Sequence, residues 1–557
     1  MTSTIRLLVP LVGLVAAALI ARRAVGQVRL NPVGDLLQSR WAPIAFGVVT
    51  ALVTWWVWGS LSQVAVYHDE AAYQLQARIF ASGRWTAPAP PLPEFWEQMA
   101  VLVTPKLAPK MPPGHAILMV PGIWLGLPGL VSVVLSGVTG GLLFALARRV
   151  SGAWVALLAW FVWLTAPRAL IWRAAYFSEA TTGALWLASW WALLEWRTTR
   201  RRHWLLILAA CIGWGAITRP LTMLAFALPV GLVVVWTVMQ HREWRDLTLA
   251  LALGISILAI IPLWSSRTTG DARSTPLALY TRQYMPWDVP GFGFDSTPPL
   301  RALPHDLAKV DAIFVGLHTG HTVSALPQIL WRRLSFVMSD VWSGWRSPLA
   351  LLALLGLLVA PTAGWFAFAT ATVLFLSYAS YAHAPSWSVY YSESLPVLAF
   401  LTALGAWFVL RRIVGLPLKG TDGELVRANA DIAAPLAVVI GLFLMLWPAC
   451  SDVRMVHDLR QRETLYHRIF RELTAAIPAQ KSIVFVRYRS NHAGHFSLVR
   501  NVPDLESART WVVYDRGAEN ARLMHLAPDR VPYLYDDSRL AIVPLSDTAG
   551  PPPLAKH

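Results

Sequence analysis

Long apolar runs recur along the chain, and most approach the length that crosses a membrane. A transmembrane helix needs about 20 mostly apolar residues. A further apolar segment at 5–21 has no small-residue cleavage site after it, which favours an uncleaved helix over a removed signal peptide. The other expected spans lie near 42–65, 126–147, 152–170, 179–196, 204–218, 221–239, 247–265, 348–361, 364–381, 393–410 and 433–450. The pattern predicts a mostly α-helical, polytopic transmembrane bundle with about 11–12 spans.

Composition supports residence in a lipid bilayer and argues against nucleic acid as a partner. The 557 residues are 56% hydrophobic and only 14% charged, and the 29 tryptophans suit the membrane–water interface. The net charge of +16 comes from arginines that sit in short clusters between apolar runs, as in cytoplasmic loops. Cys211 and Cys450 are far apart and give neither a disulfide framework nor a metal-ligand spacing.

The basic clusters also predict how the chain is oriented. Short cytoplasmic loops are enriched in Lys and Arg, and one assignment places every basic cluster on that side. The first loop at about 66–115, the long loop at about 266–346 and the tail after 451 then lie outside the cell. The basic segments are 21–40, 147–149, 197–203, 241–245 and 411–419.

Three regions follow from this reading. Residues 1–41 form an apolar helix and a basic cytoplasmic segment, and residues 42–450 form the transmembrane domain. Residues 451–557 alternate β-rich runs with helix-compatible segments, which predicts a small extracytoplasmic α/β domain. The β-rich runs lie at 482–488, 510–515, 531–537 and 540–545.

An acidic pair, Asp69-Glu70, follows the 42–65 span directly. Acidic residues stabilise a helix N-terminus by about 0.3–1 kcal/mol, so a solvated helix start is one interpretation. However, Asp69 shares a helical face with Tyr73 and Gln76, and such a polar face at the membrane surface suits a ligand. The pair is therefore a candidate for catalysis, with Tyr73 as a substrate contact.

The same loop ends in "KLAPKMPPGHAILMVPG" at 106–122. Lys106 and Lys110 are cations on the side where the topology does not call for them, and lysine suits contact with phosphate. The Pro-Pro-Gly sequence holds Lys110 and His115 near the membrane edge. A rigid turn with a snorkelling lysine is the alternative.

Further ionisable residues occur at the outer ends of later spans. Arg173 and Glu179 flank the start of one span, where a simple ion pair between them is one explanation. Arg219 occupies the tight turn "TRP" between two spans. The sequence "SVYYSES" starts another span and contributes Tyr390, Tyr391 and Glu393.

Together these residues place carboxylates, cations and tyrosines at one depth. A carboxylate can act as a general base, and cations can hold a phosphate leaving group. Attack of a hydroxyl on a sugar whose phosphate lies among the lipid headgroups needs a carboxylate and cations at this depth. The sequence has no P-loop, HExxH, GxSxG or CxxC motif, and His492 and His495 have no evident third zinc ligand.

The arrangement resembles the GT-C superfamily of polytopic membrane glycosyltransferases. Within it, the chain looks like the branch with protein O-mannosyltransferases, lipid A aminoarabinose transferases and RgtA/B/C/D-like transferases. The resemblance covers about residues 42–410. It rests on "HDEAAYQLQARIFASGRW", "KMPPGHAILMVPG", "YFSEATTGALWLA", "TRPLTMLAF" and "YYSESLPVLAFL".

The resemblance implies a GT-C fold in a bacterial inner membrane and a polyprenyl-phosphate-linked sugar as donor. The acceptor would be a glycan, a glycolipid or a protein, and some such enzymes use a divalent metal ion. The implied catalytic residues are Asp69, Glu70 and Glu179, and the implied phosphate ligands are Lys110, Arg219, Arg173 and Lys106. His115, Tyr73, Tyr390, Tyr391 and Glu393 would contact substrate, although "YYSESLP" departs from the Arg-Tyr usual in the family.

Two other functions remain open at this stage. A transporter or flippase of a lipid-linked solute would carry ionisable groups near the bilayer midplane, and here they cluster at the span ends. A catalytically inactive relative that acts as a scaffold is the second alternative.

Overall fold

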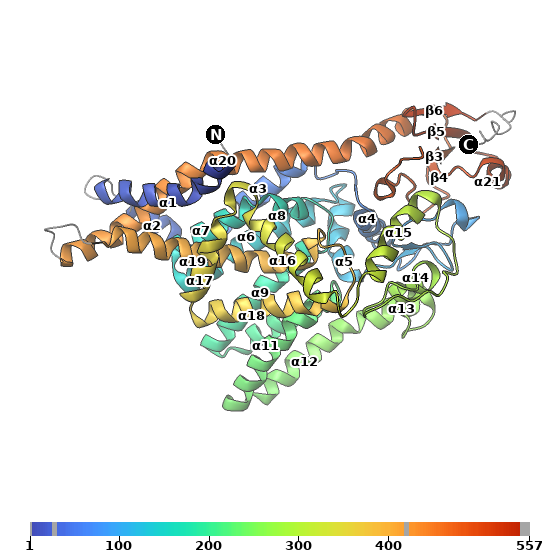
Figure 1. The fold of residues 1–557 in the computed structure, drawn as a ribbon. Coiled ribbons are helices and arrows are strands. Elements are labelled where there is room, and N and C mark those ends of the chain that lie inside the picture. Colours follow the sequence, from blue (N-terminus) through green and yellow to red (C-terminus); the bar gives the residue numbers. More distant parts are fainter. Residues whose placement is uncertain (1–2, 25–30, 417–422, 546–557) are drawn as a thin grey trace.

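Most of the molecule is a bundle of helices, and a four-stranded sheet lies at one end of it (Figure 1). The computed structural model describes residues 3–24, 31–416 and 423–545. The expected mostly α-helical architecture is confirmed. Residues 25–30 and 417–419, which belong to two of the expected basic segments, lie outside the described residues.

All but one of the bundle helices overlap the apolar runs of the sequence, and the exception is the short helix at Asn31–Gln38. Proline often marks their first turn, as at Pro220, because its missing N–H has no helical partner there in any case. The bundle helices are α1 (Ser3–Ala24), α2 (Asn31–Gln38), α3 (Ala42–Trp58), α6 (Leu130–Ser151), α7 (Ala153–Leu164), α8 (Pro167–Arg173), α9 (Glu179–Thr199), α10 (Arg202–Ala216), α11 (Pro220–His241), α12 (Trp244–Leu258), α13 (Ile260–Thr269), α17 (Leu349–Leu358), α18 (Thr362–Ser377), α19 (Leu395–Val414) and α20 (Gly423–Ala475).

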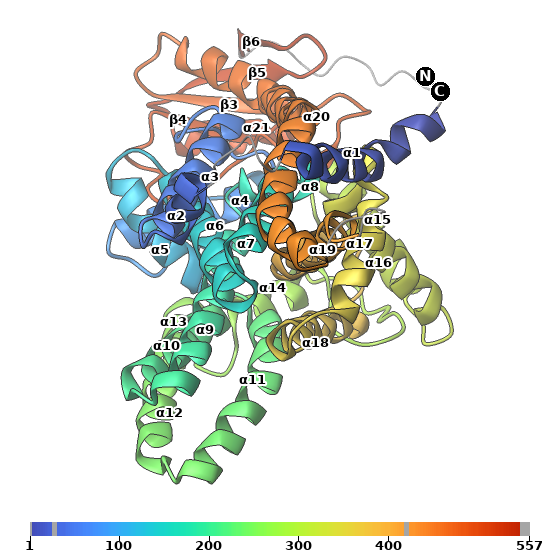
Figure 2. The same cartoon turned by 90° about the vertical axis from the view of Figure 1, so that its left-hand side faces the viewer.

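Every expected span overlaps a helix, and the chain is a multi-pass membrane protein. In the described residues, six helices are long and apolar enough to cross a membrane, or up to nine if each bent pair is one span. Others, such as α10, are shorter apolar helices. Helices α11 and α12 project from the bundle (Figure 2), and the exposed apolar side chains of α11, among them Leu228 and Leu232, suit contact with lipid.

Small residues let the bundle helices approach closely. A Cβ added to Gly356 in α17 would lie 1.8 Å from the carbonyl oxygen of Leu401 in α19. One added to Gly405 in α19 would lie 1.8 Å from the carbonyl oxygen of Leu352. In lipid, the hydrophobic effect does not drive helices together, so close backbone packing at glycines contributes to their association instead.

The remaining elements are mostly short. They are α4 (His68–Ala81), η1 (Pro93–Phe95), β1 (Val101–Leu102), β2 (Ala108–Pro109), α5 (Pro113–Trp124), α14 (Pro276–Tyr284), α15 (His305–Thr319), α16 (Leu326–Trp342), η2 (Gly344–Arg346), η3 (Tyr378–Ser380), η4 (Ser388–Ser394), β3 (Ser482–Arg487), η5 (Gly494–Phe496), β4 (Thr510–Tyr514), η6 (Gly517–Glu519), α21 (Asn520–Leu526), β5 (Val531–Asp536) and β6 (Ala541–Pro544). The long loop at 266–346 thus contains α14, α15 and α16.

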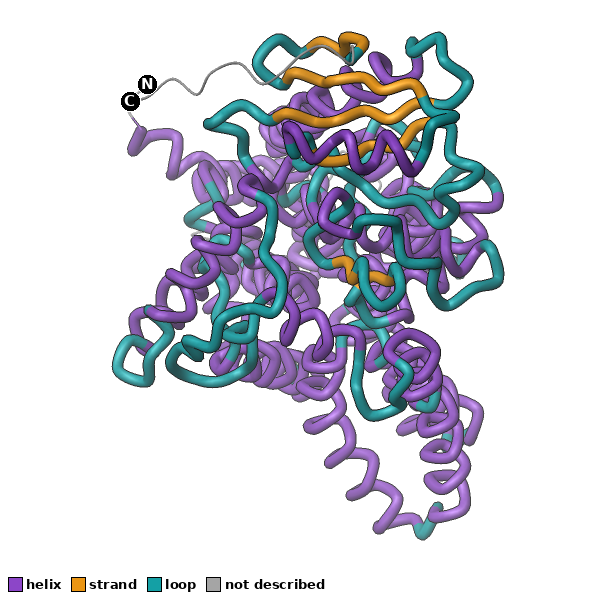
Figure 3. The backbone as a smooth tube through the Cα atoms, turned by 90° about the vertical axis from the view of Figure 1, so that its right-hand side faces the viewer, coloured by secondary structure: helices purple, strands orange, loops and turns teal. Residues whose placement is uncertain are grey.

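The sheet packs against α4 rather than standing apart from the bundle. Its strands lie side by side in one layer (Figure 3). Their order is β4-β3-β5-β6, with β3 parallel to β4 and β5 and with β6 antiparallel at one edge. Leu75 and Ile79 of α4 share a hydrophobic cluster with Phe485 of β3 and Val513 of β4. The expected boundary at residue 451 falls inside α20, a single helix of 53 residues that runs along the bundle toward the sheet (Figure 1).

Candidate active site

The acidic pair lies at the first turn of α4, and its two carboxylates have different surroundings. Glu70 is fully buried, and its Oε2 accepts hydrogen bonds from the backbone N–H groups of Val66 at 2.6 Å and Tyr67 at 3.1 Å. Its Oε1 accepts one from Tyr176 N–H at 3.2 Å and pairs with Arg460 Nη2 at 2.8 Å. The Glu70 carboxylate is therefore surrounded by hydrogen-bond donors, and it caps the start of α4.

Asp69, one position earlier, is exposed. It makes no hydrogen bond or ion pair with any residue that the structure describes. Desolvation by the surrounding protein raises the pKa of Asp69 above its ordinary value, while the positive charges of Lys110 and Arg219 act in the opposite direction. This carboxylate is thus available to a ligand, and the charges of Lys110 and Arg219 act on it.

Lys110 follows β2 and lies between a carboxylate and an aromatic ring. Its Nζ is 3.8 Å from Oδ2 of Asp288 and 4.6 Å from the ring centroid of Tyr280. Lys106 is different, because its Nζ donates to the backbone oxygen of Arg267 at 2.8 Å. Of the two lysines, Lys110 is the one that acts electrostatically on Asp69.

Arg219 directly precedes α11 and forms an ion pair with Glu179 of α9. Its Nη2 also donates to the hydroxyl of Tyr378 at 3.3 Å, and its guanidinium lies 5.5 Å from the ring centroid of Tyr390. An ion pair between Arg173 and Glu179 was one explanation offered by the sequence, but Glu179 pairs instead with Arg219, 40 residues further along.

Arg173 is buried at the end of α8. Its guanidinium lies 3.8 Å from the ring centroid of Trp163, and its Nη2 donates to the carbonyl oxygen of Leu164 at 2.8 Å. Its Nε and Nη1 have no hydrogen-bond partner within the described parts of the chain. Neither contact joins Arg173 to Asp69 or Lys110.

Tyr73 lies about one helical turn beyond Asp69 and is buried. Burial raises its pKa to about 12, and the nearby Asp69 carboxylate adds to this shift. Its ring packs edge-to-face on His115 with 4.9 Å between centroids. Burial lowers the pKa of His115 to about 4, and its ring nitrogens contact Thr181 Oγ1 at 2.8 Å and the backbone oxygen of Tyr176 at 3.2 Å. His115 is thus a neutral side chain that supports Tyr73.

The motif "SVYYSES" forms η4 and contributes to a cluster of aromatic rings beside Arg219. Tyr390 packs near Tyr378, with 5.1 Å between ring centroids. The hydroxyl of Tyr391 lies 2.9 Å from His383 Nε2. Glu393 is buried and accepts a hydrogen bond from the Thr182 hydroxyl. Of the three, Tyr390 has its ring beside Arg219, and the charge of Glu393 also acts on this arginine.

Asp288 is a site residue that the sequence did not single out. It lies in the long loop between α14 and α15, and its Oδ1 is 3.6 Å from His318 Nε2 and 3.5 Å from the hydroxyl of Tyr381. Together with the contact to Lys110, these interactions tie the long loop to the site. A lone Asp in "WDVPGFG" has no periodic or motif context that could have identified it.

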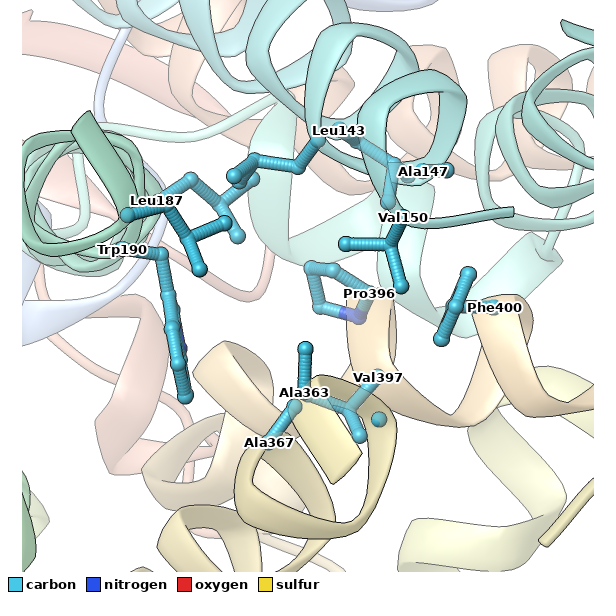
Figure 4. A pocket seen from close by; sticks show the side chains of 13 residues that line it. Leu143, Ala147, Val150, Leu187, Trp190, Ala363, Ala367, Pro396, Val397 and Phe400 are labelled. Atoms are coloured by element: carbon cyan, nitrogen blue, oxygen red, sulfur yellow. The ribbon is translucent and has the colours of Figure 1, made fainter. Parts of the chain in front are cut away.

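An apolar pocket lies between α6, α9, α18 and α19 (Figure 4). Its lining includes Leu187 and Trp190 of α9 and Pro396 of α19, and none of its lining residues is ionisable. Leu187 is eight residues beyond Glu179, which corresponds to about 12 Å along a helix. Two of the helices that line this pocket thus begin near site residues: α9 begins at Glu179, and α19 begins two residues after Glu393.

The described residues contain no group of three or more His, Cys, Asp or Glu side chains arranged to hold a metal ion. His492 lies 3.3 Å from Oδ2 of Asp537, and the ring of His495 lies 5.5 Å from that of His68. His495 thus contacts the start of α4, whereas the partner of His492 lies within the tail.

Known proteins match this architecture over nearly its whole length. ArnT from Cupriavidus metallidurans bound to undecaprenyl phosphate is 17% identical, with a TM-score of 0.51, and the match covers 90% of this chain and 94% of that one. The same protein in the apo state gives 17% identity and a TM-score of 0.50, over 89% of this chain and 93% of that one. The chain therefore has the GT-C fold, as the sequence motifs led us to expect.

A narrower match concerns the middle of the chain. Residues 128–265 match the family model described as dolichyl-phosphate-mannose-protein mannosyltransferase. This segment runs from α6 to α13 and includes Glu179 and Arg219, but not Asp69 or Lys110. No curated protein sequence matches the chain.

Proposed function

We propose that the chain is a membrane glycosyltransferase that moves a sugar from a polyprenyl-phosphate donor to a hydroxyl acceptor at the extracytoplasmic face of a bacterial inner membrane. The observation that supports this most is the carboxylate of Asp69, which has no partner among the described residues and on which the charges of Lys110 and Arg219 act. A base and two cations at one membrane surface are what sugar transfer from a lipid phosphate requires.

Lys110 and Arg219 hold the donor phosphate in this proposal. Arg219 is oriented by its ion pair with Glu179, so its guanidinium need not reorganise when phosphate arrives. The apolar pocket between α6, α9, α18 and α19 accommodates part of the polyprenyl chain. That ArnT, with the same fold, has been solved with undecaprenyl phosphate supports a lipid phosphate of this kind.

Asp69 is the proposed base. As the acceptor oxygen bonds to the anomeric carbon, Asp69 takes the hydroxyl proton, and the bond between that carbon and the phosphate oxygen breaks. The electron pair leaves with the phosphate, whose charge Lys110 and Arg219 stabilise. Attack from the face opposite the phosphate inverts the anomeric configuration. The raised pKa of Asp69 makes it a stronger base than an ordinary aspartate.

The long loop closes over this site in the proposal and excludes water. Asp288 holds the loop to Lys110, and an incoming phosphate competes with its carboxylate for the same ammonium group. The acceptor is a hydroxyl of a glycan, a glycolipid or a protein. A divalent metal ion is not needed for any step of this scheme.

A transfer assay tests the proposal. Purified protein in lipid nanodiscs is incubated with radiolabelled polyprenyl-phosphate sugars, and released sugar and transferred sugar are measured. We expect turnover with at least one donor in the wild type and a rate about 10²–10⁴-fold lower in Asp69→Asn. Donor binding without turnover, together with flux of the lipid-linked solute in proteoliposomes, would instead support a transporter or flippase. Absence of both activities with intact binding would support a catalytically inactive scaffold.

A further inference from the structure

The backbone that precedes Asp69 is held by two arginines from the last hundred residues of the chain. Arg500, in the loop between β3 and β4, donates from Nη1 to the carbonyl oxygen of Ala65 at 2.7 Å. Its Nη2 donates to the carbonyl oxygen of Val66 at 3.3 Å. Arg460, on α20, pairs with Glu70 at 2.8 Å. These contacts bracket the proposed base on its N-terminal and C-terminal sides.

The contact made by Arg460 is buried, and those made by Arg500 are half-buried. Both partners in the pair of Arg460 with Glu70 are fully buried, and Arg460 Nη1 also reaches Glu463 at 3.2 Å. The hydroxyl of Tyr67 donates to the same Glu463 at 3.0 Å. A guanidinium fork holds two acceptors in fixed geometry, which a single ammonium group does not do. The segment from Ala65 to Glu70 is thus fixed relative to α20.

The tail around Arg500 is itself anchored to the first loop. Asn501 donates from Nδ2 to the carbonyl oxygen of Trp96 at 2.9 Å, and its backbone N–H donates to Gln98 Oε1 at 2.8 Å. One hydrophobic cluster joins α4 to β3 and β4. The sheet therefore holds α4 from the side, while the two arginines hold its first turn.

We infer that Arg460 and Arg500 are positioning residues for the proposed base, and that the C-terminal region serves catalysis by orienting the turn that presents Asp69 to Lys110 and Arg219. The inference rests on the proposed function. Asp69 has no side-chain partner among the described residues, so only its backbone directs its carboxylate. A displacement of about 1 Å at a reacting group can cost about 10²-fold in rate.

Arg500→Lys is the main test, with Arg530→Lys as the matched control. Arg530 also donates to backbone carbonyls, those of Ala508 at 2.8 Å and Leu505 at 3.0 Å, but both lie within the tail. In Arg500→Lys we expect kcat to fall about 10–100-fold, while donor KM and the affinity for polyprenyl phosphate stay within about twofold. Arg530→Lys should retain kcat within about twofold.

The pH profile separates positioning from a general loss of structure. Desolvation raises the pKa of Asp69, and the charges of Lys110 and Arg219 lower it, so a displaced carboxylate has a different balance of the two. The acid limb of kcat/KM in Arg500→Lys should therefore shift away from its wild-type position. A variant that is merely less well folded would lose active enzyme without moving this limb. Arg460→Lys, which keeps a cation beside Glu70, provides a second variant for the same readout.

The outcomes are distinct. Wild-type turnover with an unchanged kcat and pH profile in both Arg500→Lys and Arg460→Lys would overturn the inference and leave the proposed function standing. An equal loss in Arg530→Lys, or a parallel loss of donor binding, would also overturn it, because the effect would then be one on the tail as a whole. Wild-type protein that transfers no sugar from any donor would refute the proposed function itself.

Discussion

The first turn of α4 carries two neighbouring carboxylates that differ in burial and in hydrogen-bond partners. On one side, the Glu70 carboxylate is fully buried and bound by three backbone N–H groups and Arg460. On the other side, the Asp69 carboxylate is exposed and interacts with Lys110 and Arg219 only through their charge. Adjacent side chains of a helix point about 100° apart, so one short motif supplies both environments.

The difference separates folding from chemistry. The N–H groups at the start of a helix have no partner within the helix. At α4, the Glu70 carboxylate accepts hydrogen bonds from two backbone N–H groups at this end, those of Val66 and Tyr67. Because the capping is done by Glu70, Asp69 is not needed for it. A carboxylate that contributes little to folding can be kept for a substrate, so we expect substitutions at the two positions to have different effects.

The largest effect should come from Asp69→Asn. The amide keeps the shape of the side chain and cannot accept the proton, so transfer should fall about 10²–10⁴-fold, the usual contribution of a general base. Donor affinity and the thermal unfolding temperature should stay close to those of the wild type. Initial rates with a labelled donor measure the loss, and wild-type turnover by this variant would remove Asp69 from the role of base.

Glu70→Ala should instead reduce stability. The substitution leaves Arg460 buried without its main partner, and breaking a buried pair in this way typically costs about 3–5 kcal/mol. Thermal unfolding of the purified protein measures the effect. Glu463→Ala is the matched control, because Glu463 also pairs with Arg460 but is partly exposed, and it should cost less. A wild-type unfolding temperature for Glu70→Ala would contradict the claim that Glu70, unlike Asp69, stabilises the fold.

Lys110→Ala tests whether the cations that face Asp69 bind phosphate. Loss of one charged hydrogen bond, worth about 1.5–3 kcal/mol, should weaken binding of polyprenyl phosphate about 10–100-fold. Lys106→Ala serves as the control, because Lys106 contacts a backbone oxygen and should leave the affinity within about twofold. Equal affinities for the Lys110 variant and the wild type would argue against a phosphate at this position. Titration of nanodisc-embedded protein provides the measurement.

Much of the fold was predictable because lipid imposes a simple rule on the sequence. Apolar runs of membrane length gave the helices, and each expected span overlaps one. The small C-terminal sheet was also expected, since β3, β4, β5 and β6 fall within the four β-rich runs that end the chain. The placement of Asp69 next to the start of α4 followed from local chemistry alone.

Pairings between distant residues could not be predicted in this way. The partner of Glu179 is Arg219 rather than the nearer Arg173, because helix packing and not sequence distance decides which guanidinium reaches it. Arg460 lies 390 positions from Glu70, and nothing in its helical surroundings marks it. Asp288 sits in an irregular part of the long loop, where no period fixes the direction of a side chain.

The smallest expected effect concerns Asp288 and has the opposite sign to that of Lys110. Its carboxylate lies 3.8 Å from Lys110 and occupies the cation that the donor phosphate would use, so Asp288→Asn should raise the affinity for polyprenyl phosphate. Both side chains are partly exposed, which limits such a pair to about 0.2–1 kcal/mol and the gain to about fivefold at most. Asp295→Asn removes a charge from the same loop at an exposed position and should leave the affinity unchanged. Weaker binding in Asp288→Asn would mean that Asp288 contacts the donor directly, and the loop would then take part in binding rather than compete with it.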